Sequence, residues 1–256
     1  MKRFFRPKTA AFLLFTVLLL LSLALNGYLF LKAQQYYLEL NGTRLNPLGL
    51  SFYPPESTTV QQEVGEITAV FFGDSRAAQW SNPSEMNNYR FINRGIGSQT
   101  SVQIAARFQQ HIEPLQPDLI IVQMCINDLK TIPLFPQNEQ ATIQNCLSNI
   151  DQVLAEAEQI GATVILTTVF PVGDVPLERQ IVWSPAIPKA VTAVNEQIRT
   201  KASNNVYIFD TFNLLVDERG LINREFAFDE LHLNEAGYAY LNDELVQYLH
   251  VQEFPP

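Results

Sequence analysis

Cysteine is scarce in this 256-residue chain, which contains only Cys125 and Cys146. These two do not form a Cys-x-x-Cys motif, and no group of cysteines and histidines has the spacing of a zinc site. Two cysteines also cannot supply the several bridges that hold a disulfide-rich domain together. A single bridge is allowed, and the sequence leaves the redox state of the pair open. We expect neither a metal nor a cofactor.

Basic residues are also few once the N-terminus is set aside. Five of the 17 Lys and Arg residues lie in the first 32 positions, where there is no acid, so the remainder carries 12 basic and 26 acidic residues. The resulting net charge of −14 on the remainder disfavours nucleic acid as a partner. It equally disfavours docking on anionic lipid through a basic patch, whereas neutral or cationic substrates are tolerated.

Internal repeats and low-complexity tracts are absent, and the length fits one large domain with an appendage. The appendage is the almost entirely apolar run 9–31, which is long enough for a bilayer because a spanning helix takes about 20 residues. The basic residues before it predict a cytoplasmic N-terminus, with the rest of the chain on the other side of the membrane. We expect a cytoplasmic stub and anchor over residues 1–33, a tether over 34–65 and a domain over 66–256.

Two alternatives to an anchor remain open. A cleaved signal peptide has an apolar core of roughly 7–15 residues and a small-x-small cleavage site, and its removal would leave a secreted protein. Ser22-Leu23-Ala24 has that form but lies inside the apolar run, which favours an uncleaved helix. A buried core helix is disfavoured by the length of the run and by its basic flank.

The tether holds turn and breaker signals and no sustained periodicity, so we expect it to lack regular structure. Some of its residues are expected to pack on the domain: Leu48, Leu50, Phe52 and Tyr53. We assign the tether no function of its own.

The domain alternates short apolar runs with longer stretches of helical periodicity. The apolar runs predict strands at 67–72, 89–93, 118–124, 163–170 and 206–210, and the periodic stretches predict helices at 101–115, 142–160, 187–202 and 234–250. Strands alternating with helices predict an α/β fold of three layers, a parallel sheet with helices on both faces. Asn234 is the expected N-cap of the last helix.

Polar residues follow several of the predicted strands, at the sheet edge where open α/β folds bind ligands. Ser75 follows the first strand in Gly73-Asp74-Ser75, at the start of a short helical stretch whose unpaired N–H groups suit a developing anion. The alternative interpretation is an ordinary turn, because all three residues are common in turns.

The other strand ends carry the loop 95–98, then Asn127 with Asp128, and finally Asp229 with His232. A nucleophilic serine needs a base, the base needs a carboxylate, and the tetrahedral intermediate needs donors for its oxyanion. The three-residue spacing predicts that Asp229 contacts His232, although the pair also suits a plain helix-entry turn. Asp210 is the alternative carboxylate.

The chain has two further histidines. His111 lies beside two glutamines in the predicted helix 101–115 and is expected to face solvent, and His250 lies near the C-terminus. His232 is therefore the best placed base. Asp128 is expected to brace its loop.

Four blocks in order, spanning residues 73–237, resemble those of the SGNH/GDSL hydrolases, a family of serine esterases and lipases on a flavodoxin-like sheet. They are Gly73-Asp74-Ser75, Asn93-Arg94-Gly95-Ile96-Gly97-Ser98-Gln99-Thr100, Ile126-Asn127-Asp128 and, last, Asp229-Glu230-Leu231-His232 followed by Asn234 and Gly237-Tyr238. The resemblance implies that Ser75 is the nucleophile and that its own N–H, an N–H of the second block and the Asn127 side chain form the oxyanion hole. In the second block, Ser98 aligns with the glycine that lends its N–H, and Gly97 is the alternative.

Three departures from the family pattern bear on the substrate. Arg76 and Ala77 replace the usual Leu-Ser, and Arg76 could face the substrate as a cation. Ser98 replaces a glycine and needs a permitted backbone conformation. Cys125 replaces the usual glycine two residues before Asn127, and its side chain is expected to crowd the strand end.

We therefore expect a membrane-tethered, extracytoplasmic serine hydrolase that cleaves lipid or cell-envelope esters through an acyl-serine, with Asp229 orienting His232. An acyltransferase that acts on envelope glycans is the first alternative. A catalytically silent glycan- or lipid-binding module is the second, although such a module has no need of the full set of residues.

Overall fold

The computed structural model describes residues 7–54, 65–84, 86–252 and 254. The chain divides into two compact units, Met1–Pro47 and Leu48–Pro256, which are described separately. In the first unit the structure describes one long helix, and the second unit is the domain that carries the candidate site.

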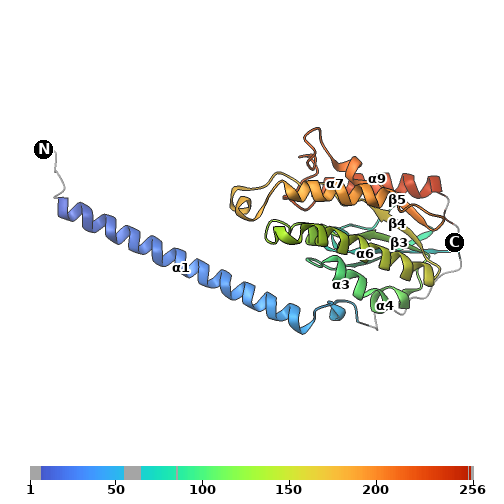
Figure 1. Cartoon of the computed structure of the whole chain (residues 1–256), viewed down its shortest axis with the longest axis horizontal. Helices are drawn as coiled ribbons and strands as arrows, with labels where there is room; N and C mark the ends of the chain where they lie inside the picture. The colour runs from blue at the N-terminus through green and yellow to red at the C-terminus, as the bar shows by residue number, and fades with distance from the viewer. Residues whose placement is uncertain (1–6, 55–64, 85, 253, 255–256) are drawn as a thin grey trace. The chain divides into compact units, whose positions relative to one another are not determined.

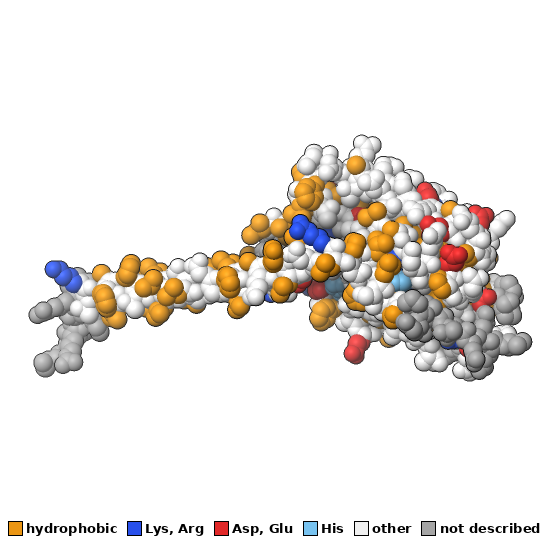
Figure 2. Space-filling view, turned by 90° about the horizontal axis from the view of Figure 1, so that it is seen from below, with side chains coloured by type: hydrophobic (Ala, Val, Ile, Leu, Met, Phe, Trp, Pro, Cys, Tyr) orange, Lys and Arg blue, Asp and Glu red, His pale blue; other side chains and the backbone are white. Residues whose placement is uncertain are grey.

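The first unit is α1 (Pro7–Leu45), a helix of 39 residues (Figure 1). It is long and apolar enough to cross a membrane, and a signal sequence would pass the same test. Hydrophobic side chains are exposed along it (Figure 2). The expectation that the chain is irregular from residue 34 onward is wrong for residues 34–45, which continue α1 because they include many good helix formers. The helix ends before Asn46-Pro47, because proline disfavours helical backbone at the residue that precedes it.

The second unit is built on a five-stranded parallel sheet of order β2-β1-β3-β4-β5 (Figure 1). This is the flavodoxin-like order that the resemblance implied. The strands are β1 (Ile67–Gly73), β2 (Tyr89–Gly95), β3 (Leu119–Gln123), β4 (Thr163–Thr167) and β5 (Val206–Phe209).

The helices of this unit confirm the predicted alternation. They are α2 (Ser75–Ala78), α3 (Ser101–Ala106), α4 (Phe108–His111), α5 (Ile126–Leu129), α6 (Glu139–Gln159), α7 (Ala186–Arg199), α8 (Thr211–Leu215) and α9 (Glu235–Gln252). Short 3-10 turns are η1 (Leu50–Phe52), η3 (Glu113–Leu115), η4 (Pro136–Asn138) and η5 (Leu177–Val182). Asn234 caps α9 as expected, since its Oδ1 accepts the N–H of Gly237 at 3.0 Å.

The predicted single helix over 101–115 is instead three short pieces, α3, α4 and η3. Arg107 lies between α3 and α4 with φ −104° and ψ 5°, outside the helical region. Its guanidinium reaches Gly73 O at 2.9 Å, so the backbone bends where this side chain turns into the protein. Pro114 lacks the N–H that would continue the last turn.

Alternate residues of the strands feed two separate cores. Val70, Phe72 and Val122 pack with α3, α4, α6 and α7, whereas Phe71 and Ile121 pack with Trp80 and α9. The sheet is therefore covered on both faces, which is why its strands are continuously apolar.

Two glycines allow the close approaches that shape the site. A Cβ on Gly73 would lie 1.8 Å from Gln123 O, and a Cβ on Gly95 would lie 2.2 Å from Ala78 N. The end of β1 therefore lies directly against β3, and α2 lies directly against β2. Because the chain leaves β1 toward β2 on one side and returns to β3 on the other, the loops after β1 and β3 flank the topological switch point, where ligands bind in such sheets.

Candidate active site

Ser75 is the first residue of α2, directly after β1. Asp74 holds the N-cap position, and its Oδ1 accepts the N–H of Arg76 at 2.9 Å. The Ser75 side chain is half-buried, and its Oγ lies 2.9 Å from His232 Nε2. The structure thus brings the predicted nucleophile and the predicted base into hydrogen-bonding contact, although 157 residues separate them.

His232 is held from the other side by Asp229, whose Oδ2 and Oδ1 lie 2.9 and 3.0 Å from Nδ1. Asp229 Oδ1 also accepts the N–H groups of Leu231 and His232, each at 2.7 Å. The hydrogen-bond network assigns the proton to Nδ1 and leaves Nε2 as the acceptor for the Ser75 hydroxyl. Burial alone would raise the pKa of Asp229, but the hydrogen bonds from His232 and the two backbone N–H groups hold it below its usual value.

The alternative carboxylate, Asp210, is used elsewhere. It forms an ion pair with Arg199 at 2.8 Å and accepts the Thr168 hydroxyl at 3.0 Å. It also caps α8 through the N–H of Asn213. Of the two candidates, Asp229 is the one in contact with His232.

The expectation that His111 faces solvent is wrong. His111 is 1% exposed and lies against Tyr53 and Arg107. Burial and the charge of Arg107 lower its pKa to about 4. The neighbouring glutamines indicated an exposed face, but the break at Arg107 reorients α4 and turns His111 inward.

Arg76 does not face the substrate either, because its side chain is fully buried. Its Nε, Nη1 and Nη2 donate to the carbonyl oxygens of Leu231, Phe170 and Pro171 at 2.8, 3.0 and 3.2 Å. Burial lowers its pKa to about 10, which still leaves it charged. Arg76 therefore joins the turn of Ser75 to the residue before His232 and to the loop after β4, a role that no local sequence pattern signals.

Gly97 and Ser98 lie in the exposed loop after β2. A Cβ on Gly97 would lie 3.9 Å from Ser75 Cβ, so the loop lies beside the nucleophile. Ser98 has φ 65°, in the left-handed region, which explains why glycine is the usual residue here. Asn127 lies buried in the first turn of α5, and its Nδ2 donates to Gln99 O at 2.9 Å. All the predicted oxyanion donors therefore lie in the loops that follow β1, β2 and β3.

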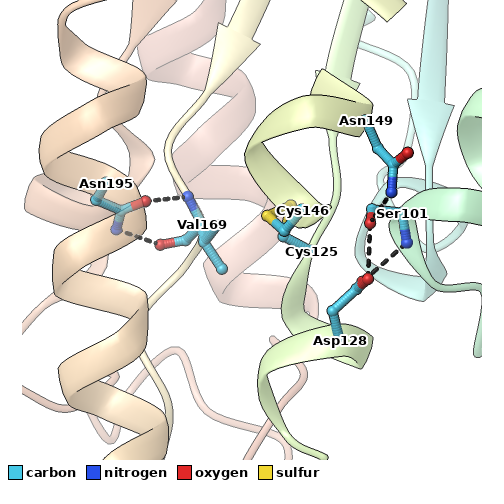
Figure 3. Close-up of a disulfide and its surroundings, with 7 residues drawn as sticks. All are labelled: Ser101, Cys125, Asp128, Cys146, Asn149, Val169 and Asn195. Carbon is cyan, nitrogen blue, oxygen red and sulfur yellow. Dashed lines mark hydrogen bonds between the residues drawn. A yellow bond between two sulfur atoms is a disulfide. The ribbon is translucent and has the colours of Figure 1, made fainter. Parts of the chain in front are cut away.

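The expectation that Cys125 crowds the strand end is wrong. Its φ is 90°, so Cys125, like Ser98, is a residue other than glycine that has a left-handed backbone conformation beside the site. Its side chain points into the core and forms a disulfide with Cys146 of α6, with the two Cα atoms 5.7 Å apart (Figure 3).

Asp128 braces its loop, as the sequence predicted. Its carboxylate accepts the N–H and the hydroxyl of Ser101 at 2.8 and 2.6 Å. The Ser101 hydroxyl also accepts Asn149 Nδ2 at 2.8 Å, so α5, α3 and α6 are joined at this point (Figure 3).

A cavity of about 930 Å³ lies between α9 and residues 79–84, lined in part by Phe228, Leu233 and Asn234. Neither Ser75 nor His232 lines it, so it flanks the segment of His232 rather than forming the site. Among the described residues, no group of three or more His, Cys, Asp or Glu side chains could hold a metal ion.

The sequence profile of the GDSL-like Lipase/Acylhydrolase family matches residues 67–240. The chain belongs to this family. A search of curated proteins finds no match. The matched range contains all four sequence blocks that carried the resemblance.

Solved structures agree with the family assignment. A GDSL-like lipase from Bacteroides thetaiotaomicron is 26% identical with a TM-score of 0.65, covering 80% of this chain and 98% of that one. A lipase/acylhydrolase from Enterococcus faecalis is 19% identical with a TM-score of 0.54, covering 73% and 96%. An acetylxylan esterase from Geobacillus stearothermophilus is 17% identical with a TM-score of 0.51, covering 73% and 95%. The last two likenesses concern the fold alone.

The buried carboxyl of Asp74 predicts a pH-dependent stability. Burial raises its pKa to about 6, against the opposing effect of Arg76, and its Oδ2 has no hydrogen-bond partner among the described residues. Because the folded pKa exceeds the unfolded value of about 3.9, the contribution of Asp74 to stability decreases as the pH rises from about 4 to about 6. Asp74→Asn keeps an oxygen for the N–H of Arg76 and removes this titration.

The difference in the free energy of unfolding, Asp74→Asn minus the natural protein, should therefore increase by up to about 3 kcal/mol between pH 4 and pH 7. Urea unfolding of both proteins at several pH values measures this difference. A difference that stays constant with pH would contradict the prediction.

Proposed function

We propose that this member of the GDSL-like family is a serine esterase that hydrolyses carboxylic esters through an acyl-serine intermediate. The observation that supports this most directly is the hydrogen-bonded series from Ser75 Oγ to His232 Nε2 at 2.9 Å and from His232 Nδ1 to Asp229 at 2.9 Å. Acyl transfer to serine needs this order of nucleophile, base and orienting carboxylate.

In the first half of the reaction, Ser75 Oγ attacks the ester carbonyl carbon and its proton passes to His232 Nε2. The carbonyl electron pair moves onto oxygen, and the N–H groups of Ser75 and Ser98 with the Asn127 amide stabilise that charge, Gly97 N–H being the alternative to Ser98. Each such donor contributes about 3–4 kcal/mol to transition-state stabilisation. The intermediate then expels the alcohol oxygen, which takes the proton from His232.

In the second half, a water molecule gives a proton to His232 and attacks the acyl-serine. Collapse of the second intermediate releases the carboxylic acid and returns the proton to Ser75 Oγ. Asp229 stays ionised throughout, because its hydrogen bonds hold its pKa below its usual value, and it stabilises the imidazolium in both halves.

The charge of the chain and the exposure of Ser75 bear on the proposed substrate class. The acidic chain tolerates neutral esters, and Ser75 is only half-buried, so part of its surface is exposed to an approaching ester. One structural relative is an acetylxylan esterase, which makes acetyl esters the first class to assay. We place the reaction outside the cytoplasm, with α1 as an uncleaved anchor, because basic residues precede its apolar run.

Ser75→Ala should reduce the turnover of a small chromogenic acetyl ester by about 10⁴-fold or more, since it removes the hydroxyl proposed to form the acyl intermediate. The melting temperature should change little, because Ser75 is only half-buried. Ser203→Ala, at an exposed serine, is the matched control and should keep full activity. Retention of more than a few per cent of turnover in Ser75→Ala, with contamination excluded, would remove Ser75 from the mechanism.

Asp229→Asn should reduce turnover by about 10³–10⁴-fold, because an amide can stabilise the wrong imidazole tautomer and cannot balance the imidazolium. Asp210→Asn should leave turnover within about threefold, because Asp210 does not contact His232: the change weakens its partly exposed ion pair with Arg199, its hydrogen bond with Thr168 and the cap of α8. The reverse ranking of the two variants on one ester would show that Asp210 is the functional carboxylate.

The full chain should remain in the membrane pellet after high-salt and carbonate washing, because α1 supplies a continuous apolar span. Replacing Leu19 and Leu20 together by arginine should release it, since each central charge costs about 2.5–3.5 kcal/mol of insertion free energy. A soluble secreted form that begins near Leu25 would instead identify residues 1–24 as a signal peptide.

A further inference from the structure

The segment that follows α1 lies on the loop beside Ser75. This segment, residues 48–53, is separated from the end of α1 at Leu45 by Asn46 and Pro47, and it belongs to the domain unit. Leu48 O accepts Gln99 Nε2 at 2.9 Å, and the Tyr53 hydroxyl donates to Gly95 O at 2.6 Å. Gly95 and Gln99 delimit the loop that carries Gly97 and Ser98. The 48–53 segment therefore holds both ends of the candidate oxyanion loop.

Beneath the segment lies a buried polar cluster that consists of Gln99, Arg107 and His111, none more than 4% exposed. Arg107 donates to Gln99 Oε1 at 2.6 Å and to Gly73 O at 2.9 Å. Its Nη1 lies 3.2 Å from His111 Nδ1, so neutral His111 accepts there and presents its Nε2–H to Leu50 O at 3.3 Å. A buried charge is costly unless its hydrogen bonds are made, so this cluster has little freedom to rearrange.

The cluster leads directly to the groups proposed for catalysis. Gly73 O, which accepts Arg107, lies two residues before Ser75. Gln99 O accepts Asn127 Nδ2 at 2.9 Å, and Gln99 directly follows Ser98. Hydrogen bonds thus run from Leu48 through Gln99 to the nucleophile turn and to Asn127, and Gln99 is joined to Ser98 through the chain.

Tyr53 contacts both the buried cluster and the residues at the start of the loop. Its ring lies 4.6 Å from the Arg94 guanidinium and meets the His111 ring edge-on at 5.3 Å between centroids. Burial raises the pKa of the Tyr53 hydroxyl, despite Arg107 and Arg94, so the hydroxyl keeps the proton that it donates to Gly95 O. The ring and the hydroxyl therefore contribute separately, the ring by stacking and the hydroxyl by fixing the start of the loop.

We propose that the 48–53 segment is a positioning element for the oxyanion loop, with Tyr53 as its principal residue. The inference rests on the proposed esterase function. Tyr53 touches no substrate; it acts through Gly95 and the cluster on the N–H of Ser98 and on Asn127. The chain immediately after α1 is then required for turnover as well as for attachment.

The expected signature is a loss of kcat with little change in KM. Oxyanion donors act on charge that develops only in the transition state, so displacing them leaves ground-state binding almost intact. Losing a donor costs about 10²–10³-fold in kcat, and a displaced donor should cost less. We expect Tyr53→Phe, which keeps the ring, to lower kcat about 3–10-fold, and Tyr53→Ala about 10–100-fold.

The experiment uses the full chain in detergent, with Tyr37→Phe and Tyr37→Ala as matched controls at an exposed tyrosine of α1. Active-site titration with a fluorophosphonate gives the concentration of competent Ser75, so kcat is expressed per titrated site. A phenylboronic acid, whose serine adduct places an oxygen in the oxyanion hole, should lose affinity in parallel with kcat/KM.

Lower kcat per titrated site in both Tyr53 variants, with parallel loss of boronate affinity and unchanged Tyr37 controls, would support the proposal. A normal kcat per titrated site would overturn the proposal, even if fewer active sites react with the fluorophosphonate. A purely structural role for Tyr53 would change only the number of competent active sites. Ser75→Ala in the same assay separates the two claims. If Ser75→Ala is inactive while the Tyr53 variants are normal, only this inference fails, whereas an active Ser75→Ala would overturn the proposed function and this inference with it.

Discussion

The buried guanidinium of Arg76 connects the three parts of the chain that meet at Ser75. Its hydrogen bonds to the carbonyl oxygens of Leu231, Phe170 and Pro171 join α2 to the segment of His232 and to the loop after β4. That loop is held in turn by Asn195 of α7, which pairs with both backbone groups of Val169 (Figure 3). Arg76 therefore links the segment of Ser75 to the segment of His232 without touching the Ser75 hydroxyl or the His232 ring.

A second buried guanidinium lies on the other side of the same turn. Arg107 packs over Phe72, in the core shared with α3 and α6, whereas Arg76 packs over Phe170, in the core shared with α9. The turn at Gly73 to Arg76 is thus fixed between two buried cations, one on each face of the sheet. Within this turn, the charge of Arg76 lowers the pKa of the Asp74 carboxyl. The burial of Asp74 has the larger effect and raises that pKa to about 6.

The two family glycines that this chain replaces share one physical explanation. Ser98 and Cys125 both have left-handed backbone, where a side chain costs about 1–2 kcal/mol relative to glycine. Each is followed directly by a feature that anchors its loop. Gln99, after Ser98, donates to Leu48 O, and α5 begins directly after Cys125. The surrounding hydrogen bonds and the Cys125–Cys146 disulfide hold these conformations, so the loops keep the shape that glycine would give them.

The sequence by itself determined the features that depend on neighbours along the chain. Strand runs, helical periodicity, the contact of Asp229 with His232 and the cap at Asn234 all arise within a few residues, where spacing decides geometry. The order of strands and helices then allowed only a parallel sheet with Ser75 at its carboxyl edge. Tertiary structure alone decided where long polar side chains point. Arg76 and His111 turned inward, Arg107 broke a helix and Tyr53 reached Gly95 at the start of the candidate oxyanion loop, because their partners lie far away in sequence and come close only when the chain is folded.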